Sequence, residues 1–382
     1  MKLPLRLLIN GITFDGAVLA PLLLNIKYWQ IRSCKITFLG TSLLEKRIKE
    51  AKIIKDFEFI ALEGKKGLGD KLSLIIEGLR RNIIATFYIK RIKNNYDVIY
   101  SRSSVLDLVI FPYFLKIFDK KIKWMTVFDN TVPFTDSGNK LIRFLAWGFF
   151  QMSLFFLKRA DRIFVISKTL GDYLIKKGFD KEKIILTGNA VEIDLIKKAR
   201  RYKKYNIDSL FVGRINETKG IYDMLNVLEI VKKKYPNFQL AIMGTGDIVT
   251  EKKYKGEIKN RELEKNVQFL GYKTGLEKFN IIKSSKIFWF LSKSESFGIA
   301  LLEAVCCGVK AFAYDLPAYK NIYKDNEILT FKKDDFHSVA NVVIKTFDKK
   351  DFDNPCGKLL LNRYSWNRIA KIEFDNFSRL SK

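Results

Sequence analysis

The sequence predicts an α/β protein built from two doubly wound, Rossmann-like domains in series. Three observations lead to this fold class. The chain has 382 residues, enough for two domains of ordinary size. Short apolar segments alternate with longer helix-like segments, as in parallel sheets covered by helices. The alternation stops at the basic segment 197–205 (KKARRYKKY) and then starts again. We therefore expect two domains that face each other across a ligand cleft.

The first half alternates in the order that a parallel sheet requires. Gly11 and Gly16 are expected in the turn after the first strand. The expected strands are Leu5–Ile9, Lys35–Leu39, Asp97–Tyr100, Lys123–Phe128 and Arg162–Ile166, and the expected helices are Ala17–Ile31 and Val105–Phe118.

The second half repeats this layout. The expected strands are Ile207–Val212, Phe238–Met243, Val267–Leu270, Ile287–Leu291 and Ala311–Tyr314, and the expected helices are Gly220–Tyr235, Ile248–Lys265, Leu276–Ser284 and Gly298–Cys307. We place a first domain over residues 1–196, a second over 206–363 and a C-terminal helix over 364–382.

The composition excludes several kinds of site. His337 is the only histidine, so catalytic triads that need histidine and His-rich zinc sites are not available. The four cysteines include the adjacent pair Cys306 and Cys307 and no CxxC, which argues against a disulfide framework or a structural zinc site. The first apolar segment is interrupted by Arg6 and does not fit a signal peptide. We expect a cytoplasmic protein.

The charge balance is strongly basic. Lys and Arg number 69 against 41 Asp and Glu, a formal net charge of +28 that is spread over both halves. Such a surface suits an anionic membrane or nucleic acid, and a Lys-rich background composition explains the same numbers.

The segment Ser294–Gly308 (SESFGIALLEAVCCG) carries the clearest chemical signal. It follows an expected strand and opens an expected helix, where unpaired backbone amides and the helix dipole can hold a phosphate. Gly298 would let a ligand approach the backbone. Seven residues separate Glu295 from Glu303, so Glu303 is placed to accept hydrogen bonds from vicinal hydroxyls such as those of ribose. The alternative is a capping carboxylate at Glu295 and a solvated helix residue at Glu303.

The segment Phe211–Gly220 (FVGRINETKG) follows the first strand of the same half. It supplies Arg214 and Lys219 beside glycines, and two cations at a strand end can hold a diphosphate. The alternative is a pair of surface cations on a loop.

These motifs, taken in order, resemble the nucleotide-sugar domain of retaining glycosyltransferases of family 4, which have the GT-B fold. The motifs are GRINETKG, MGTGD (243–247), FLGY (269–272) and ESFGIALLEAVCCG. The first half is similar to the same family in FDGA (14–17), YDVIYSR (96–102), RADRIFVISKTL (159–170) and TGNAVEID (187–194), and YSWNRIAKIEFDNF (364–377) resembles its closing helix, which crosses back to the first domain.

The resemblance implies a role for each matching position. Residues 1–196 would bind the acceptor and residues 206–363 the nucleotide sugar. Arg214 and Lys219 would bind the donor diphosphate, Glu303 the ribose hydroxyls, and Glu295 the donor sugar. The remaining implied donor contacts are Gly16, Gly213, Gly244, Phe297, Gly298, Ile299 and Ala300.

The sequence departs from the family at several positions. Ala17 and Ala190 stand where glycine is frequent, and Lys310 stands where proline is frequent. Many members have a histidine near the donor sugar, where this chain offers Asp129 in TVFDNTVP (126–133).

The resemblance implies transfer by front-face attack, with the departing phosphate oxygen as the base. No side-chain nucleophile is then required, and cations on the protein would replace a divalent metal. A literal DxD occurs at Asp351 and Asp353, and we interpret it as a solvated turn. We expect neither a cofactor nor a metal site.

The acceptor is expected to be a saccharide or a lipid-linked saccharide. Leu141–Leu157 is strongly apolar, and its cations Arg143, Lys158, Arg159 and Arg162 lie within it or just after it, which suits a membrane interface, whereas a buried helix explains the same residues. Further cations of the same half are Lys65, Lys66, Arg80, Arg81, Lys90, Arg91 and Lys93.

Two other functions remain open on the sequence alone. One is a nucleotide-sugar epimerase of the same fold, although the scarcity of histidine disfavours the versions with imidazole bases. The other is a basic nucleic-acid-binding protein, which would leave Glu295 and Glu303 unexplained. We expect no nucleic-acid partner.

Overall fold

The computed structural model describes residues 4–12, 19–62, 71–132, 140–324 and 326–381. The chain divides into two compact units. The first consists of residues 1–188 together with 366–382, and the second of residues 189–365. The last helix, α15 (Trp366–Leu380), thus belongs to the first unit, where it packs on α1 (Leu19–Gln30).

The first unit contains a seven-stranded parallel sheet in the order β3-β2-β1-β4-β5-β6-β7. The strands are apolar on both faces, as expected for a sheet covered on both sides. They are β1 (Leu5–Gly11), β2 (Cys34–Gly40), β3 (Glu58–Ala61), β4 (Val98–Ser101), β5 (Lys123–Phe128), β6 (Arg162–Val165) and β7 (Ile184–Leu186).

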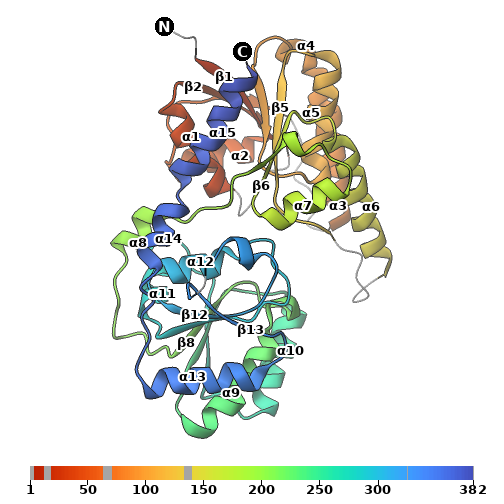
Figure 1. Cartoon of the computed structure of the whole chain (residues 1–382). Helices are drawn as coiled ribbons and strands as arrows, with labels where there is room; N and C mark the ends of the chain where they lie inside the picture. The colour runs from red at the N-terminus through yellow and green to blue at the C-terminus, as the bar shows by residue number, and fades with distance from the viewer. Residues whose placement is uncertain (1–3, 13–18, 63–70, 133–139, 325, 382) are drawn as a thin grey trace. The chain divides into compact units, whose positions relative to one another are not determined.

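Helices cover both faces of this sheet. Figure 1 shows α1 and α15 on one side and α3, α5 and α6 on the other. Besides α1 and α15, the helices of the unit are α2 (Ser42–Ala51), α3 (Lys71–Phe87), α4 (Ile89–Ile92), α5 (Leu106–Phe118), α6 (Lys140–Leu157), α7 (Lys168–Lys176) and the 3-10 turn η1 (Lys181–Lys183).

The apolar segment Leu141–Leu157 forms α6. Leu154 and Leu157 are buried, whereas Phe144, Met152 and Phe155 are exposed, so the helix is neither wholly buried nor wholly free. Among the helices in the described ranges, none combines the length and apolarity needed to span a bilayer.

The second unit contains a six-stranded parallel sheet in the order β10-β9-β8-β11-β12-β13. Its strands are β8 (Ser209–Val212), β9 (Leu240–Met243), β10 (Val267–Gly271), β11 (Ile287–Phe290), β12 (Lys310–Tyr314) and β13 (Leu329–Phe331). Its helices are α8 (Ile193–Lys198), α9 (Ile221–Lys234), α10 (Ile248–Asn260), α11 (Gly275–Ser284), α12 (Ile299–Cys306), α13 (Phe336–Asp348) and α14 (Gly357–Arg363), with the 3-10 turns η2 (Glu217–Lys219) and η3 (Tyr319–Asn321).

Both sheets reverse their winding direction beside the first strand, at β1/β4 and at β8/β11. At such a switch point the loops after the two neighbouring strands lead away in opposite directions, which makes this edge the usual ligand site of doubly wound sheets. In the second unit these two loops are the segments that carry Arg214, Lys219 and Glu295.

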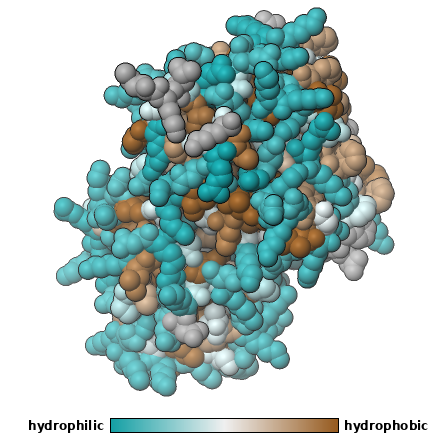
Figure 2. All heavy atoms as spheres, turned by 45° about the horizontal axis from the view of Figure 1, so that its top comes forward, coloured by the Kyte–Doolittle hydropathy of each residue, from teal (hydrophilic) through white to brown (hydrophobic). Residues whose placement is uncertain are grey.

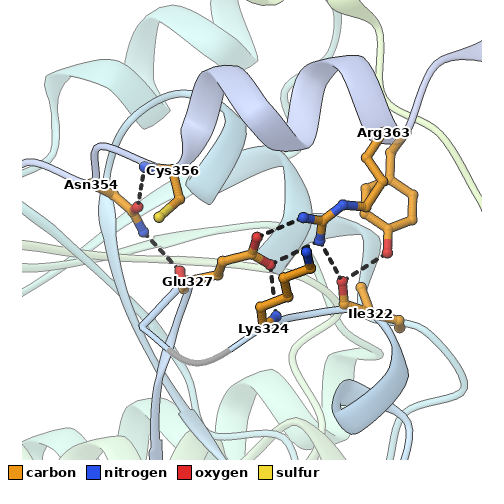
Figure 3. A network of polar contacts seen from close by, with 7 residues as sticks. Ile322, Lys324, Glu327, Asn354, Cys356 and Arg363 are labelled. Atoms are coloured by element: carbon orange, nitrogen blue, oxygen red, sulfur yellow. Dashed lines mark hydrogen bonds and ion pairs between the residues drawn. The ribbon is translucent and has the colours of Figure 1, made fainter.

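A buried ion pair closes the C-terminal end of the second unit. Glu327 accepts hydrogen bonds from both terminal nitrogens of Arg363 at 3.0 and 2.9 Å, and its backbone carbonyl accepts one from Asn354 at 2.8 Å (Figure 3). Arg363 also donates to the Ile322 carbonyl. This network fixes α14 against the segment that leads into β13.

Candidate functional site

The loops after β8 and β9 meet through their glycines. Gly213 donates its backbone N–H to the Met243 carbonyl, and Gly244 donates to that of Gly271. Gly244 has a φ of 149°, and a Cβ there would lie 1.9 Å from the Gly213 carbonyl oxygen. This approach is possible only without a side chain. Glycine at position 244 is therefore required by the packing of this edge.

Lys219 and Glu295 form an ion pair across the switch point. The Asn216 side chain accepts a hydrogen bond from the Lys219 backbone N–H at 3.1 Å and so caps the turn η2. The Lys219 Nζ lies 2.5 Å from Glu295 Oε1 and 5.9 Å from the centre of the Phe290 ring. The loop after β8 thus brings a cation to the loop after β11.

Arg214 lies on the loop after β8. Its side chain is exposed and makes no ion pair with any residue in the described ranges. An exposed guanidinium beside the Lys219–Glu295 pair can turn toward an anionic ligand at this edge.

Helix α12 begins with free backbone donors. Its N-cap Gly298 adopts the left-handed conformation, with φ 81° and ψ 57°, and a Cβ at this position would meet the Tyr319 ring at 3.1 Å. The first helical hydrogen bond runs from the Leu302 N–H to the Gly298 carbonyl. The amides of Ile299 and Ala300 therefore have no helical acceptor, as at every helix start. They can donate to an anion.

Glu303 lies in the helix interior but is not solvated. Its side chain is buried, and Lys278 of α11 lies 2.6 Å from its Oε1. Burial raises the pKa of Glu303, the Lys278 charge counteracts this shift, and the Glu192 charge adds to it. The interpretation as a solvated helix residue is therefore wrong. A buried carboxylate with one occupied oxygen can accept further hydrogen bonds from hydroxyl groups.

Phe297 lies in the loop before α12 but is not exposed like an ordinary loop residue. Its side chain is buried and its ring lies 5.9 Å from that of Tyr364. The buried ring anchors the loop that leads into Gly298, so the backbone amides at the start of α12 are held in place.

Sequence reasoning missed Lys278 and Tyr319. Lys278 comes from a different helix than its partner, and no local pattern relates the two positions. Tyr319 follows β12, is buried against Gly298, and its hydroxyl has no hydrogen-bond partner within the described part of the chain. Burial raises its pKa well above the ordinary value, and the Glu295 charge adds to the shift.

Two predicted site residues, Asp129 and Gly16, belong to the first unit. Asp129 follows β5 and accepts a hydrogen bond from the Ser103 hydroxyl at 3.3 Å. Burial raises the pKa of Asp129, and the charge of Arg102 opposes the shift. Gly16, with the FDGA motif, lies outside the described residues.

The DxD carboxylates are exposed, but the predicted turn is wrong, because Asp353 forms an antiparallel bridge with Val309. Lys310 forms an ion pair with Asp351, and Arg201 lies 3.7 Å from Asp353. Over the ranges that the structure covers, no group of three or more His, Cys, Asp or Glu side chains could hold a metal ion. His337 is exposed and Cys306 is buried.

Comparison with known proteins identifies the class of fold and domain. Residues 192–359 match the family described as glycosyl transferases group 1, and this segment lies within the second unit. Anabaena HepE, solved in complex with UDP and glucose, superposes with a TM-score of 0.75 over 98% of this chain and 99% of that chain, at 13% identity. The two units have the GT-B fold.

Curated relatives match over part of the chain. A phosphatidyl-myo-inositol mannosyltransferase of Mycobacterium tuberculosis is 31% identical over 195 residues, which cover 48% of this chain and 50% of the relative. A GDP-mannose:cellobiosyl-diphosphopolyprenol alpha-mannosyltransferase of Xanthomonas oryzae is 24% identical over 173 residues, 44% of this chain and 46% of the relative. The chain thus matches about half the length of these relatives.

Proposed function

We propose that this protein transfers a sugar from a UDP- or GDP-sugar to a saccharide or lipid-linked acceptor, with retention of the anomeric configuration. The observation that carries the proposal is the edge of the second unit at β8/β11. There Lys219, Glu295, the free amides of α12 and the buried Glu303 lie on loops and a helix that meet at one switch point.

Each group of this edge has a chemical task in the proposed reaction. The amides of Ile299 and Ala300, with Lys219 and Arg214, bind the diphosphate and stabilise the charge that grows as the glycosidic bond breaks. Glu303 accepts the ribose hydroxyls and Glu295 a hydroxyl of the donor sugar.

The proton of the acceptor hydroxyl goes to the departing phosphate oxygen. The reaction then needs neither a side-chain nucleophile nor a divalent cation. Asp129 of the first unit is the proposed residue beside the donor sugar, in the place where related enzymes have a histidine.

The acceptor proposal rests on the matched relatives. The names of two of them contain lipid acceptors, a phosphatidyl-inositol and a diphosphopolyprenol. A lipid-linked acceptor would place this protein in the cytoplasm at the inner face of the cell membrane. We expect no nucleic-acid partner.

The test is a donor screen scored by released UDP or GDP, with and without EDTA. The proposal expects release with one class of donor, unchanged by EDTA, and a product with the same anomeric configuration as the donor, assigned by NMR. Conversion of the sugar without release of nucleoside diphosphate would identify an epimerase instead. Thermal stabilisation by single-stranded nucleic acid and by neither nucleotide would reject the enzyme.

Glu303→Ala tests the site within the same assay. Loss of a hydrogen bond to a charged group should weaken UDP or GDP binding by about tenfold or more. Unchanged nucleotide affinity would remove the proposed ribose contact.

A further inference from the structure

Helices α3, α5 and α6 form one layer on the first sheet. α3 packs against α5, and α5 packs against α6 (Figure 1). Each of them leads into the amino end of the next strand, α3 through the short α4, so all three run antiparallel to the strands. Their C-terminal ends therefore lie along the same edge of the unit.

Helix α3 buries polar residues and exposes an apolar stripe. Glu77, Gly78 and Asn82 are buried, and Asn82 joins α3 to α5, since it donates to the Asp107 carbonyl and accepts from the Phe111 amide. Four exposed apolar residues follow helical spacing as a single stripe: Ile76, Leu79, Ile83 and Phe87. Contact of these apolar side chains with water is unfavourable unless another apolar phase covers the stripe.

α5 and α6 continue the apolar surface. Their exposed side chains are Phe114, Ile117, Phe118, Phe144, Leu145, Met152 and Phe155. Tyr113 connects the two helices, since its ring lies 6.4 Å from that of Phe155. Hydrophobic atoms reach the surface along the right-hand side of Figure 2, where Figure 1 places α5 and α6. Contiguous exposed apolar surface of this kind indicates an interaction site.

Exposed cations lie at one end of this apolar surface, and the described residues of the three helices carry no exposed carboxylate. The C-terminal ends of the three helices are followed by exposed basic residues: Lys90, Arg91, Lys120, Lys121, Lys158 and Arg159. The only acidic residues within the three helices are Glu77 and Asp107. Glu77 is buried and paired with Arg80 and Arg81, and Asp107 is largely covered. The surface is therefore complementary to an apolar phase with an anionic boundary.

We propose that the α3–α5–α6 face is a docking surface for an anionic lipid bilayer. The apolar stripes enter the acyl boundary while the cations at the helix ends meet lipid phosphates. The inference deepens the proposed function, because a lipid-linked acceptor would lie in that bilayer, but lipid binding itself requires no transfer chemistry. A second copy of this chain fits less well, since two such faces would bring cations together without exposed carboxylates to pair with them.

The test is co-sedimentation of the full chain with vesicles. Vesicles of phosphatidylcholine alone are compared with an equimolar mixture of phosphatidylcholine and phosphatidylglycerol. The variant Ile83→Glu/Phe118→Glu/Phe155→Glu changes one residue on each helix, with exposed fractions of 61%, 57% and 64%. Ile248→Glu in α10 of the second unit, 87% exposed, is the matched control.

The proposal expects binding to the anionic vesicles that weakens at high salt, because screening acts on the cations. The triple variant should bind at least about tenfold more weakly, as three carboxylates oppose apolar insertion, while Ile248→Glu binds like the unaltered chain. Equal vesicle binding by all three proteins would overturn the proposal, as would a concentration-dependent dimer that only the triple variant abolishes. Nucleotide binding, measured by thermal shift with UDP and GDP, should be retained in the triple variant. Loss of vesicle binding can then be distinguished from loss of the donor site.

Discussion

Glu295, Glu303 and Glu327 of the second unit differ from Glu373 of the first unit in the groups that donate hydrogen bonds to them. In the second unit Glu295, Glu303 and Glu327 each form an ion pair with a lysine or arginine of another element. In the first unit Glu373 of α15 is equally buried, but its hydrogen-bond donors are the neutral Tyr100 hydroxyl and Asn25 amide. Burial raises the pKa of both Glu303 and Glu373, and a positive charge opposes the shift in each case, that of Lys278 at Glu303 and that of Arg102 at Glu373.

This difference in partners indicates different roles for the carboxylates of the two units. The Lys219–Glu295 and Lys278–Glu303 pairs provide fixed charges at the edge where a diphosphate is proposed to bind, whereas the Arg363–Glu327 pair lies at α14. The first unit instead contains a group that titrates near neutral pH, since burial raises the pKa of Glu373 to about 7. The following predictions test this contrast, from the largest expected effect to the smallest.

Arg363→Ala should have the largest effect on stability. It removes both charged donors from Glu327, whose side chain is 4% exposed, and leaves that carboxylate buried without its cation. The expected loss is about 3–5 kcal/mol in the free energy of unfolding, measured by urea denaturation. Lys253→Ala breaks the exposed pair with Glu217 and should leave the midpoint unchanged. Equal midpoints for all proteins would show that the buried pair is not structural.

Lys219→Ala tests the charged pair at the proposed donor site. The substitution removes a cation from the diphosphate and leaves Glu295 without its partner. We expect kcat/KM for the best donor to fall by about 10²–10³-fold, as when an oxyanion donor is lost. Lys219→Arg retains the charge and should recover most of the rate. A rate unchanged in Lys219→Ala would exclude a transition-state contact at this position.

Some features of the fold and of the candidate site could be predicted from the sequence and others could not. The alternation of strands and helices, the start of a helix near Gly298 and the places of Glu295 before it and Glu303 within it could be predicted, because each depends on local spacing. The pairing of Lys219 with Glu295 could not, since the two are 76 positions apart and only the order β8-β11 brings their loops together. Nor could the outward stripe of α3, because periodicity shows that a helix is two-faced and not which face meets the core.

Glu373 should make the stability of the first unit depend on pH. Its folded-state pKa of about 7 lies above the ordinary 4.5, so the folded protein binds this proton more tightly than the unfolded chain. The stabilisation is fully present below pH 4.5 and is lost as the pH rises through 7. At about 1.4 kcal/mol per pKa unit, the total change is about 3 kcal/mol.

Comparison with Glu373→Gln isolates this contribution. Glutamine keeps the size of the side chain and cannot ionise, so its unfolding free energy should not fall with pH as that of the unaltered chain does. Asp375→Asn on the same helix is exposed and should keep the unaltered profile. Parallel pH profiles for the unaltered chain and Glu373→Gln would refute the assignment.

Lys278→Met should make Glu303 of the second unit easier to protonate, as Glu373 of the first unit is. Burial already raises the pKa of Glu303, and Lys278 is the group that counteracts this shift. Without that cation the carboxylate should protonate at higher pH and lose its capacity to accept two ribose hydroxyls. UDP or GDP binding, measured by calorimetry as the pH is lowered, should weaken more steeply in Lys278→Met than in the unaltered chain, by up to about tenfold, the value of one hydrogen bond to a charged acceptor. Lys278→Arg preserves the charge and should follow the profile of the unaltered chain, which includes the protonation of the nucleotide itself. Parallel profiles for Lys278→Met and Lys278→Arg would show that protonation of Glu303 leaves nucleotide binding unaffected and would remove its ribose contact.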